Sequence, residues 1–126
     1  MTARMRIGEL TRRANVTPRT VRYYESIGLL PRGERKGGQH YYGEAAVVRL
    51  QKIDQLKQLG LDLDEIRDVI GLYFSDPSQR RPKQKVLAML RAHLADVDAK
   101  LADMQLLRGD LKRHIARFER WFRDQT

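Results

Sequence analysis

This chain of 126 residues contains no cysteine. It therefore has no disulfide, no thiolate nucleophile, no redox thiol and no metal site with cysteine ligands. It also lacks an apolar run of about 18 residues, the length that a membrane-spanning helix needs. Its first residues lack the apolar centre of a secretion signal. We expect a protein of the cytoplasm that makes no membrane contact.

Side chains that carry catalysis or bind metal ions are scarce as well. The histidines are His40, His93 and His114. The last two lie three heptads apart on one expected helix, so they cannot meet within a chain, although in an antiparallel dimer they could approach each other across the pair. No His-x-x-His spacing and no glycine-rich phosphate loop is present. We therefore expect no catalytic residue, no metal and no cofactor.

Positive charge, in contrast, is abundant and unevenly distributed. The net charge is +9, and residues 1–60 hold 12 Lys and Arg against 5 Asp and Glu, whereas residues 61–126 hold 13 against 11. Most of the excess therefore lies in the first half of the chain. A localised excess of cations is typical of a surface that binds the phosphates of nucleic acids.

Residues 17–25 predict a short helix that reads DNA. Thr17 is a good N-cap and Pro18 suits the first helical position. A helix over 7–14 and a turn at 15–16 precede it, and helix, turn and cationic helix are typical of a reader of the major groove. Adjacent helical residues point about 100° apart, so one of the two tyrosines should pack inside while the other contacts DNA. The predicted DNA-facing residues are Arg19, Thr20, Arg22, Tyr23 and Tyr24.

Residues 32–42 predict a small basic hairpin, with its turn at Gly37-Gly38. After a helix-turn-helix, such a hairpin is interpreted as a wing that lies against phosphates or the minor groove. A plain surface loop is the alternative. The wing residues predicted to bind DNA are Arg35, Lys36, Gln39 and His40.

Two further helices complete the expected DNA-binding domain. Residues 44–59 repeat apolar side chains at helical spacing and end at Gly60. Asp62 and Glu65 form a plausible capping box for a helix that runs to about Phe74. Residues 75–83 contain two prolines and predict a polar connector.

The last segment carries apolar residues at alternating steps of three and four, which is the pattern of a coiled-coil seam. Arg108 interrupts this pattern, and a buried arginine there would need an acidic partner such as Asp103 or Asp110. Pairing with a second copy is the preferred interpretation, and folding back onto its own domain is the alternative. The predicted seam consists of Leu87, Leu90, Leu94, Val97, Leu101, Met104, Leu111, Ile115, Phe118 and Phe122.

Trp121 lies just off this seam rather than on it. Together with Tyr73, Phe74 and His93 it is a candidate for the wall of a small-molecule effector pocket, and packing at the dimer core or edge is the alternative. The candidate pocket residues are Tyr73, Phe74, His93 and Trp121.

In order along the chain, these motifs resemble the MerR family of transcriptional regulators. The resemblance implies a winged-helix homodimer joined by an antiparallel coiled coil. It also implies binding to promoter DNA, whose distortion lets RNA polymerase engage an overlong promoter without contacting the regulator directly. It rests on segments 7–10, 19–25, 28–31 and 60–66, the hairpin that ends at Tyr42, and the long terminal helix.

Carried over by position, Arg19, Arg22 and Tyr24 match DNA-contacting residues of the family, and Arg35 with residues 38–40 matches the wing. The family usually has Gly-Tyr-Arg where this chain has Gly38-Gln39-His40, so a histidine replaces the usual wing arginine, and Lys36 is a candidate substitute. The family's cysteine sensor sites are missing, which excludes thiolate sensing of mercury, copper or superoxide. Since the chain ends soon after the seam, we expect any sensor to be built from the dimer itself.

The sequence thus predicts a mainly α-helical protein. Residues 1–74 form a winged helix-turn-helix domain with a small β-hairpin, residues 75–83 a linker, and residues 84–126 a dimerisation helix. We expect a homodimeric regulator that binds a palindromic promoter element and responds to an effector held without thiols. The alternatives are a repressor that is ligand-independent or governed by a partner, and an architectural DNA-binding protein.

Overall fold

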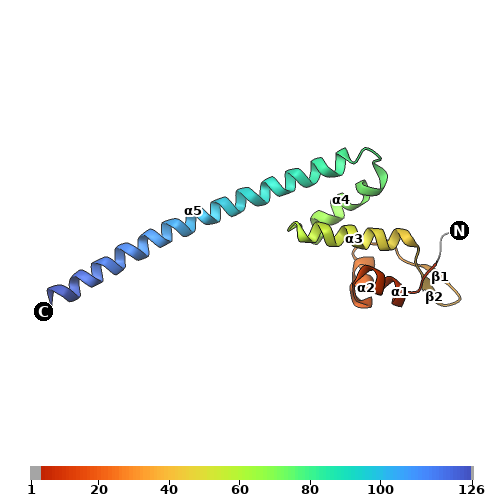
Figure 1. The fold of residues 1–126 in the computed structure, drawn as a ribbon, viewed down its shortest axis with the longest axis horizontal. Coiled ribbons are helices and arrows are strands. Elements are labelled where there is room, and N and C mark those ends of the chain that lie inside the picture. The colour runs from red at the N-terminus through yellow and green to blue at the C-terminus, as the bar shows by residue number, and fades with distance from the viewer. Residues whose placement is uncertain (1–3, 126) are drawn as a thin grey trace. The chain divides into compact units, whose positions relative to one another are not determined.

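The computed structural model describes residues 4–125, which are mainly helical with one small antiparallel hairpin (Figure 1). The described chain divides into two units, one ending at Leu90 and one starting at Arg91. No helix among residues 4–125 is long and apolar enough to cross a membrane. The elements are α1 (Ile7–Ala14), α2 (Pro18–Ser26), β1 (Glu34–Lys36), β2 (Gln39–Tyr41), α3 (Glu44–Gln58), α4 (Leu63–Ser75) and α5 (Arg80–Asp124).

The helix-turn-helix forms as its turn residues predict. Asn15 ends α1 in the left-handed region at φ 56°, a conformation that asparagine tolerates better than most residues. Thr17 caps α2 through its hydroxyl, which accepts from the Thr20 amide at 3.1 Å, and Pro18 occupies the first turn, where its missing N–H costs nothing. Gly28, at φ 80°, ends the segment.

The predicted hairpin is confirmed, and a neighbouring segment extends it. Arg35 lies opposite His40 in the register of β1 and β2. Met5 exchanges two backbone hydrogen bonds with Tyr42, both at 2.8 Å. This bridge fixes residues 4–6, the N-terminal arm, beside the hairpin. It is a contact between distant segments that local sequence patterns do not reveal.

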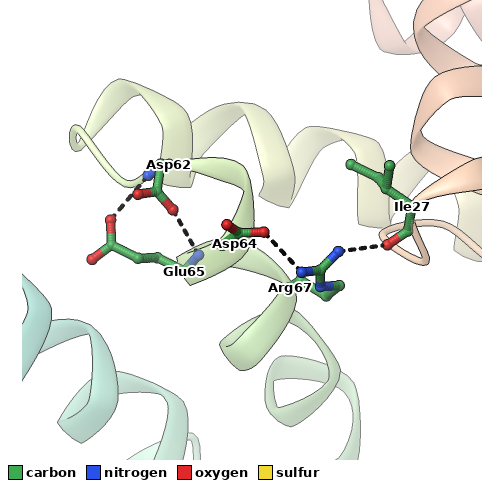
Figure 2. A network of polar contacts seen from close by, with 5 residues as sticks. All are labelled: Ile27, Asp62, Asp64, Glu65 and Arg67. Atoms are coloured by element: carbon green, nitrogen blue, oxygen red, sulfur yellow. Dashed lines mark hydrogen bonds and ion pairs between the residues drawn. The ribbon is translucent and has the colours of Figure 1, made fainter.

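The capping box of α4 is present in full. Asp62 accepts from the Glu65 amide at 2.8 Å, and the Glu65 carboxylate accepts from the Asp62 amide at 3.1 Å. Figure 2 shows these bonds beside a second contact, in which Arg67 binds Asp64 at 2.8 Å and the Ile27 carbonyl at 3.0 Å. The first contact starts the helix, and the second joins it to the end of α2.

Asp62→Ala should lower the free energy of unfolding by about 1 kcal/mol, because a helix N-cap of this type contributes about that much. Chemical denaturation with urea measures the change. Asp64→Ala is the matched control: it also removes an acid from the first turn, but its ion pair with Arg67 is exposed and should contribute at most about 0.5 kcal/mol. Equal losses for both variants would show that the cap is not responsible.

The first unit has a continuous apolar core beneath α2 and the hairpin. Helix α1 packs on α2 and α3, and α3 packs on α4. Val86 in the first turns of α5 is also buried in this core. The fully buried residues include Leu10, Val21, Leu29, Leu30, Leu50, Ile53, Leu56, Ile66, Val69 and Ile70.

The connector between α4 and α5 is shorter than the expected 75–83, because α5 already begins at Arg80. Pro82 lies inside its first turn, where amides have no partner within the helix, so a proline is tolerated there. Asp76 stabilises this start by accepting from the Ser78 and Arg81 amides at 3.0 and 2.9 Å. These bonds, with one from the Ser78 hydroxyl, hold the pKa of Asp76 below its usual value.

Candidate nucleic-acid interface

Helix α2 separates its cationic side chains from its apolar ones. Val21 and Tyr24 face the core and are buried, whereas Arg19 and Arg22 are exposed. Thr20 is half-buried, and its hydroxyl lies 3.0 Å from that of Thr17. The helix is therefore held by its inner face and presents guanidinium groups on its outer face, as a DNA-reading helix requires.

The two adjacent tyrosines take opposite positions, as the 100° rule predicts. Tyr23 is 51% exposed, whereas Tyr24 is only 5% exposed. The Tyr24 hydroxyl accepts a long hydrogen bond of 3.5 Å from Lys57. Tyr24 therefore belongs mainly to the core, which leaves only its hydroxyl for the predicted DNA contact, while Tyr23 has its whole ring edge available.

The predicted wing residues Arg35, Lys36, Gln39 and His40 are all exposed. Arg35 opposes His40, and Lys36 opposes Gln39 at the turn end. The hairpin turn has positive φ at both Gly37 and Gly38, 58° and 78°. Two lysine or arginine side chains thus extend from β1, while β2 has none.

Glu25, a residue that the sequence did not single out, connects the reader helix to the base of the hairpin. Its carboxylate accepts from the Gly33 amide at 2.9 Å and from the Tyr42 hydroxyl at 3.2 Å. The Tyr42 ring covers Gly33 so closely that a Cβ there would lie 2.8 Å from it. The glycine, the tyrosine and the glutamate therefore fix the distance between helix and wing.

The pKa of Tyr42 is raised from 10.0 to about 12 by burial of its phenol, and further by the charge and hydrogen bond of Glu25. A raised pKa means that the fold favours the protonated phenol. Its contribution to stability is therefore complete below pH 10 and is lost as the pH rises from 10 to about 12. Urea unfolding over this range should show a steeper loss for the natural chain than for Tyr42→Phe. Parallel curves would contradict this assignment.

Helix α5 carries a long apolar stripe that residues 4–125 leave uncovered over most of its length. Leu94, Leu101 and Phe122 are 60%, 56% and 65% exposed. Leu90 is the exception among the predicted seam residues, because it packs partly against the core of the first unit. The other exposed members are Leu87, Val97, Met104, Leu111, Ile115 and Phe118.

Arg108 lies on the same helical face as this stripe, four residues after Met104 and three before Leu111. Leu107 is 50% exposed and lies three residues after Met104 and four before Leu111, which places it at the edge of the same face. The stripe therefore contains Arg108 and has beside it Leu107, which the predicted seam did not include.

Family models match both parts of this arrangement. The model described as "MerR HTH family regulatory protein" matches residues 5–71, and the one described as "MerR, DNA binding" matches residues 47–114. The chain belongs to the MerR family. It is accordingly a DNA-binding transcriptional regulator and not an enzyme.

Relatives and solved structures agree with this assignment. The chain is 35% identical over 109 residues to the HTH-type transcriptional regulator ZntR of Escherichia coli (strain K12), covering 86% of this chain and 76% of that protein. It is 32% identical over 103 residues to the mercuric resistance operon regulatory protein of Bacillus cereus, with 81% and 76% covered.

Among solved structures, the transcription regulator PbrR691 of Ralstonia metallidurans CH34, in complex with lead(II), has a TM-score of 0.69 and 36% identity over 85% of this chain and 81% of that one. HiNmlR, a MerR-family regulator bound to promoter DNA, has a TM-score of 0.56 over 82% and 76% of the two chains. At 17% identity, the second likeness supports the fold alone.

This MerR-family chain does not bring the four candidate effector residues together in one pocket. His93 and Trp121 lie 28 positions apart on α5, which is roughly 42 Å along a helix. Tyr73 packs against the Lys52 ammonium, 4.6 Å from its ring centre, and burial raises its pKa. Phe74 is 46% exposed and lies 5.6 Å from the Arg49 guanidinium.

The aromatic residues near the end of α5 form a local cluster that the sequence predicted only in part. The rings of Trp121 and Phe122 meet edge to face, with centres 5.0 Å apart. With Phe118 and Arg117 they line a shallow hollow of about 370 Å³. Residues 4–125 contain no group of three or more metal-ligating side chains. The hollow near the end of α5 is thus lined mainly by aromatic side chains.

Proposed function

We propose that this MerR-family regulator acts as a homodimer joined through α5, and that the dimer binds a palindromic promoter element. The observation that carries the proposal is the exposed apolar stripe of α5, because a stripe of this length is unstable in water unless a second helix covers it. Two reader helices in a twofold dimer would then meet two half-sites a whole number of DNA turns apart.

Charge supports an antiparallel arrangement of the two α5 helices. Residues 91–105 hold 2 Lys and Arg against 3 Asp and Glu, whereas residues 106–124 hold 6 against 3. A parallel pair would place the strongly cationic halves side by side. An antiparallel pair places each cationic half beside the acidic half of its partner, which favours that orientation.

We further propose that the dimer responds to an apolar or aromatic effector held without thiols. An antiparallel pair could set Trp121 near the partner's His93, whereas one chain alone keeps the two residues apart. The aromatic cluster of Phe118, Trp121 and Phe122 supports an apolar ligand, since such pockets combine aromatic walls with a few polar groups.

Regulation would act through the shape of the promoter. We propose that effector binding makes the dimer untwist an overlong spacer in the cytoplasm, so that RNA polymerase engages both promoter elements without touching the regulator. This use of DNA deformability requires contacts on both sides of the distorted segment, which a dimer with two reader helices and two wings supplies.

The test is to map bound DNA across the genome of the native host and to transcribe the bound promoters in vitro. A palindrome within an overlong spacer, with activation that disappears when the spacer is shortened, would support distortion. A palindrome over the transcription start, with repression alone, would instead identify a repressor. Binding without a preferred sequence would identify an architectural protein and overturn the proposal.

A further inference from the structure

A hollow of about 360 Å³ lies between the reader helix and the hairpin. Arg22 of α2 lines one side and His40 of β2 the other. Two further arginines reach the same hollow from outside both elements, Arg6 from the N-terminal arm and Arg32 from the approach to the hairpin. Neither was predicted as a DNA-binding residue.

Backbone and side-chain hydrogen bonds hold Arg6 in its position beside the hollow. The bridge between Met5 and Tyr42, with two backbone bonds of 2.8 Å, anchors the residue before it to the hairpin. The Arg6 guanidinium then donates to the side-chain oxygen of Gln39 at 2.6 Å. Backbone and side chain together bring a cation from the arm to β2, a strand with no lysine or arginine of its own.

The charges around the hollow are only partly neutralised. Across residues 4–125, Arg6, Arg22 and Arg32 form no ion pair. The carboxylate of Glu25 also lines the hollow and accepts hydrogen bonds from Gly33 and Tyr42. Three guanidinium groups against one carboxylate leave an excess of positive charge that an anion would offset.

We propose that this hollow seats a phosphate of the DNA backbone, and that Arg6, positioned by Gln39, contacts it. This inference rests on the DNA-binding function. Guanidinium groups suit the role because their forked N–H donors match phosphate oxygens. Arg6 thereby supplies at the wing a guanidinium contact, which the imidazole of His40 cannot provide, and Gln39 acts as a positioning residue for Arg6.

The experiment measures DNA affinity by fluorescence anisotropy over a series of salt concentrations. One probe is a duplex that the protein prefers in a selection from random-sequence DNA. The other is a scrambled duplex of the same composition. Arg6→Ala should weaken binding to both probes alike, because a phosphate contact carries no sequence information. It should also reduce the slope of log affinity against log salt by about 1.8 for a dimer, since each lost phosphate contact contributes about 0.9.

Three further substitutions make the test specific. Arg4→Ala is the matched control, because it removes the same charge from the same arm, but Arg4 is already paired with Glu34 at 3.1 Å; its slope should not change. As a single change, Gln39→Ala should weaken DNA binding. Combined with Arg6→Ala it should cause no further loss of affinity, because Gln39 acts through Arg6. Adding His40→Arg to the Arg6→Ala variant should restore its DNA binding.

Each outcome decides the question, provided that circular dichroism shows the variants folded. If Arg6→Ala keeps the natural slope while Arg22→Ala loses binding, the proposal for Arg6 is overturned and the DNA-binding function stands. If Arg4→Ala and Arg6→Ala reduce the slope equally, only general charge is involved and the proposal is again overturned. If neither Arg6→Ala nor Arg22→Ala affects binding, the DNA-binding function of this surface fails as well.

Discussion

Arg22→Ala should abolish sequence-specific DNA binding while leaving the fold and the oligomeric state unchanged. Arg22 is exposed on the outer face of α2 and forms no ion pair within residues 4–125, so the fold does not depend on its charge. A forked arginine contact to a base edge contributes about 1–3 kcal/mol. Because a dimer loses two such contacts, affinity should fall by a factor of about 30 to 20,000.

Anisotropy titration with the selected duplex and its scrambled counterpart measures this loss. Arg22→Lys keeps the charge but not the forked donors, so it should retain binding to the scrambled duplex while losing preference for the selected one. Lys52→Met is the control for net charge, because Lys52 lies on α3 over the ring of Tyr73 and its aliphatic stem would be preserved. Natural affinity in Arg22→Ala would show that α2 is not the reader.

The helices of the first unit were predictable because the residues next to each helix start determine where it begins. Thr17 and Pro18 start α2, and Asp62 and Glu65 start α4, through bonds that span no more than three residues. Capping of this kind depends on local spacing alone. The predicted start of the terminal helix at residue 84 was wrong for a related reason. Pro82 was interpreted as a helix breaker, although it lies in the first turn of α5.

The site was predictable only where it lies on one element. Arg19 and Arg22 follow from the face of a single helix. The bond from Arg6 to Gln39 joins residues 33 positions apart, and the bond from Tyr42 to Glu25 joins residues 17 positions apart. Such pairs depend on how the arm, the helix and the hairpin pack together, which no local pattern encodes. The sequence placed Tyr42 at the end of the hairpin, but it did not predict the hydrogen bond from Tyr42 to Glu25.

Leu101→Asp should dissociate the proposed dimer. Leu101 is 56% exposed within one chain and lies mid-stripe on α5, where a second helix would cover it. Each buried leucine contributes about 1.5–3 kcal/mol, and a dimer loses two. The new carboxylates would also have to leave water without partners, which adds several kcal/mol. The dissociation constant should rise by at least about 100-fold, which analytical ultracentrifugation measures directly.

Ala102→Asp is the matched control, because it adds the same charge one residue further along α5. That step turns the side chain about 100° away from the stripe, so the variant should remain dimeric. Leu101→Asp should also weaken binding to a palindrome far more than to a single half-site, since one reader helix then acts alone. If Leu101→Asp stays dimeric at natural concentration, the copies meet elsewhere. The antiparallel dimer, and with it the effector site built from two chains, would then be ruled out.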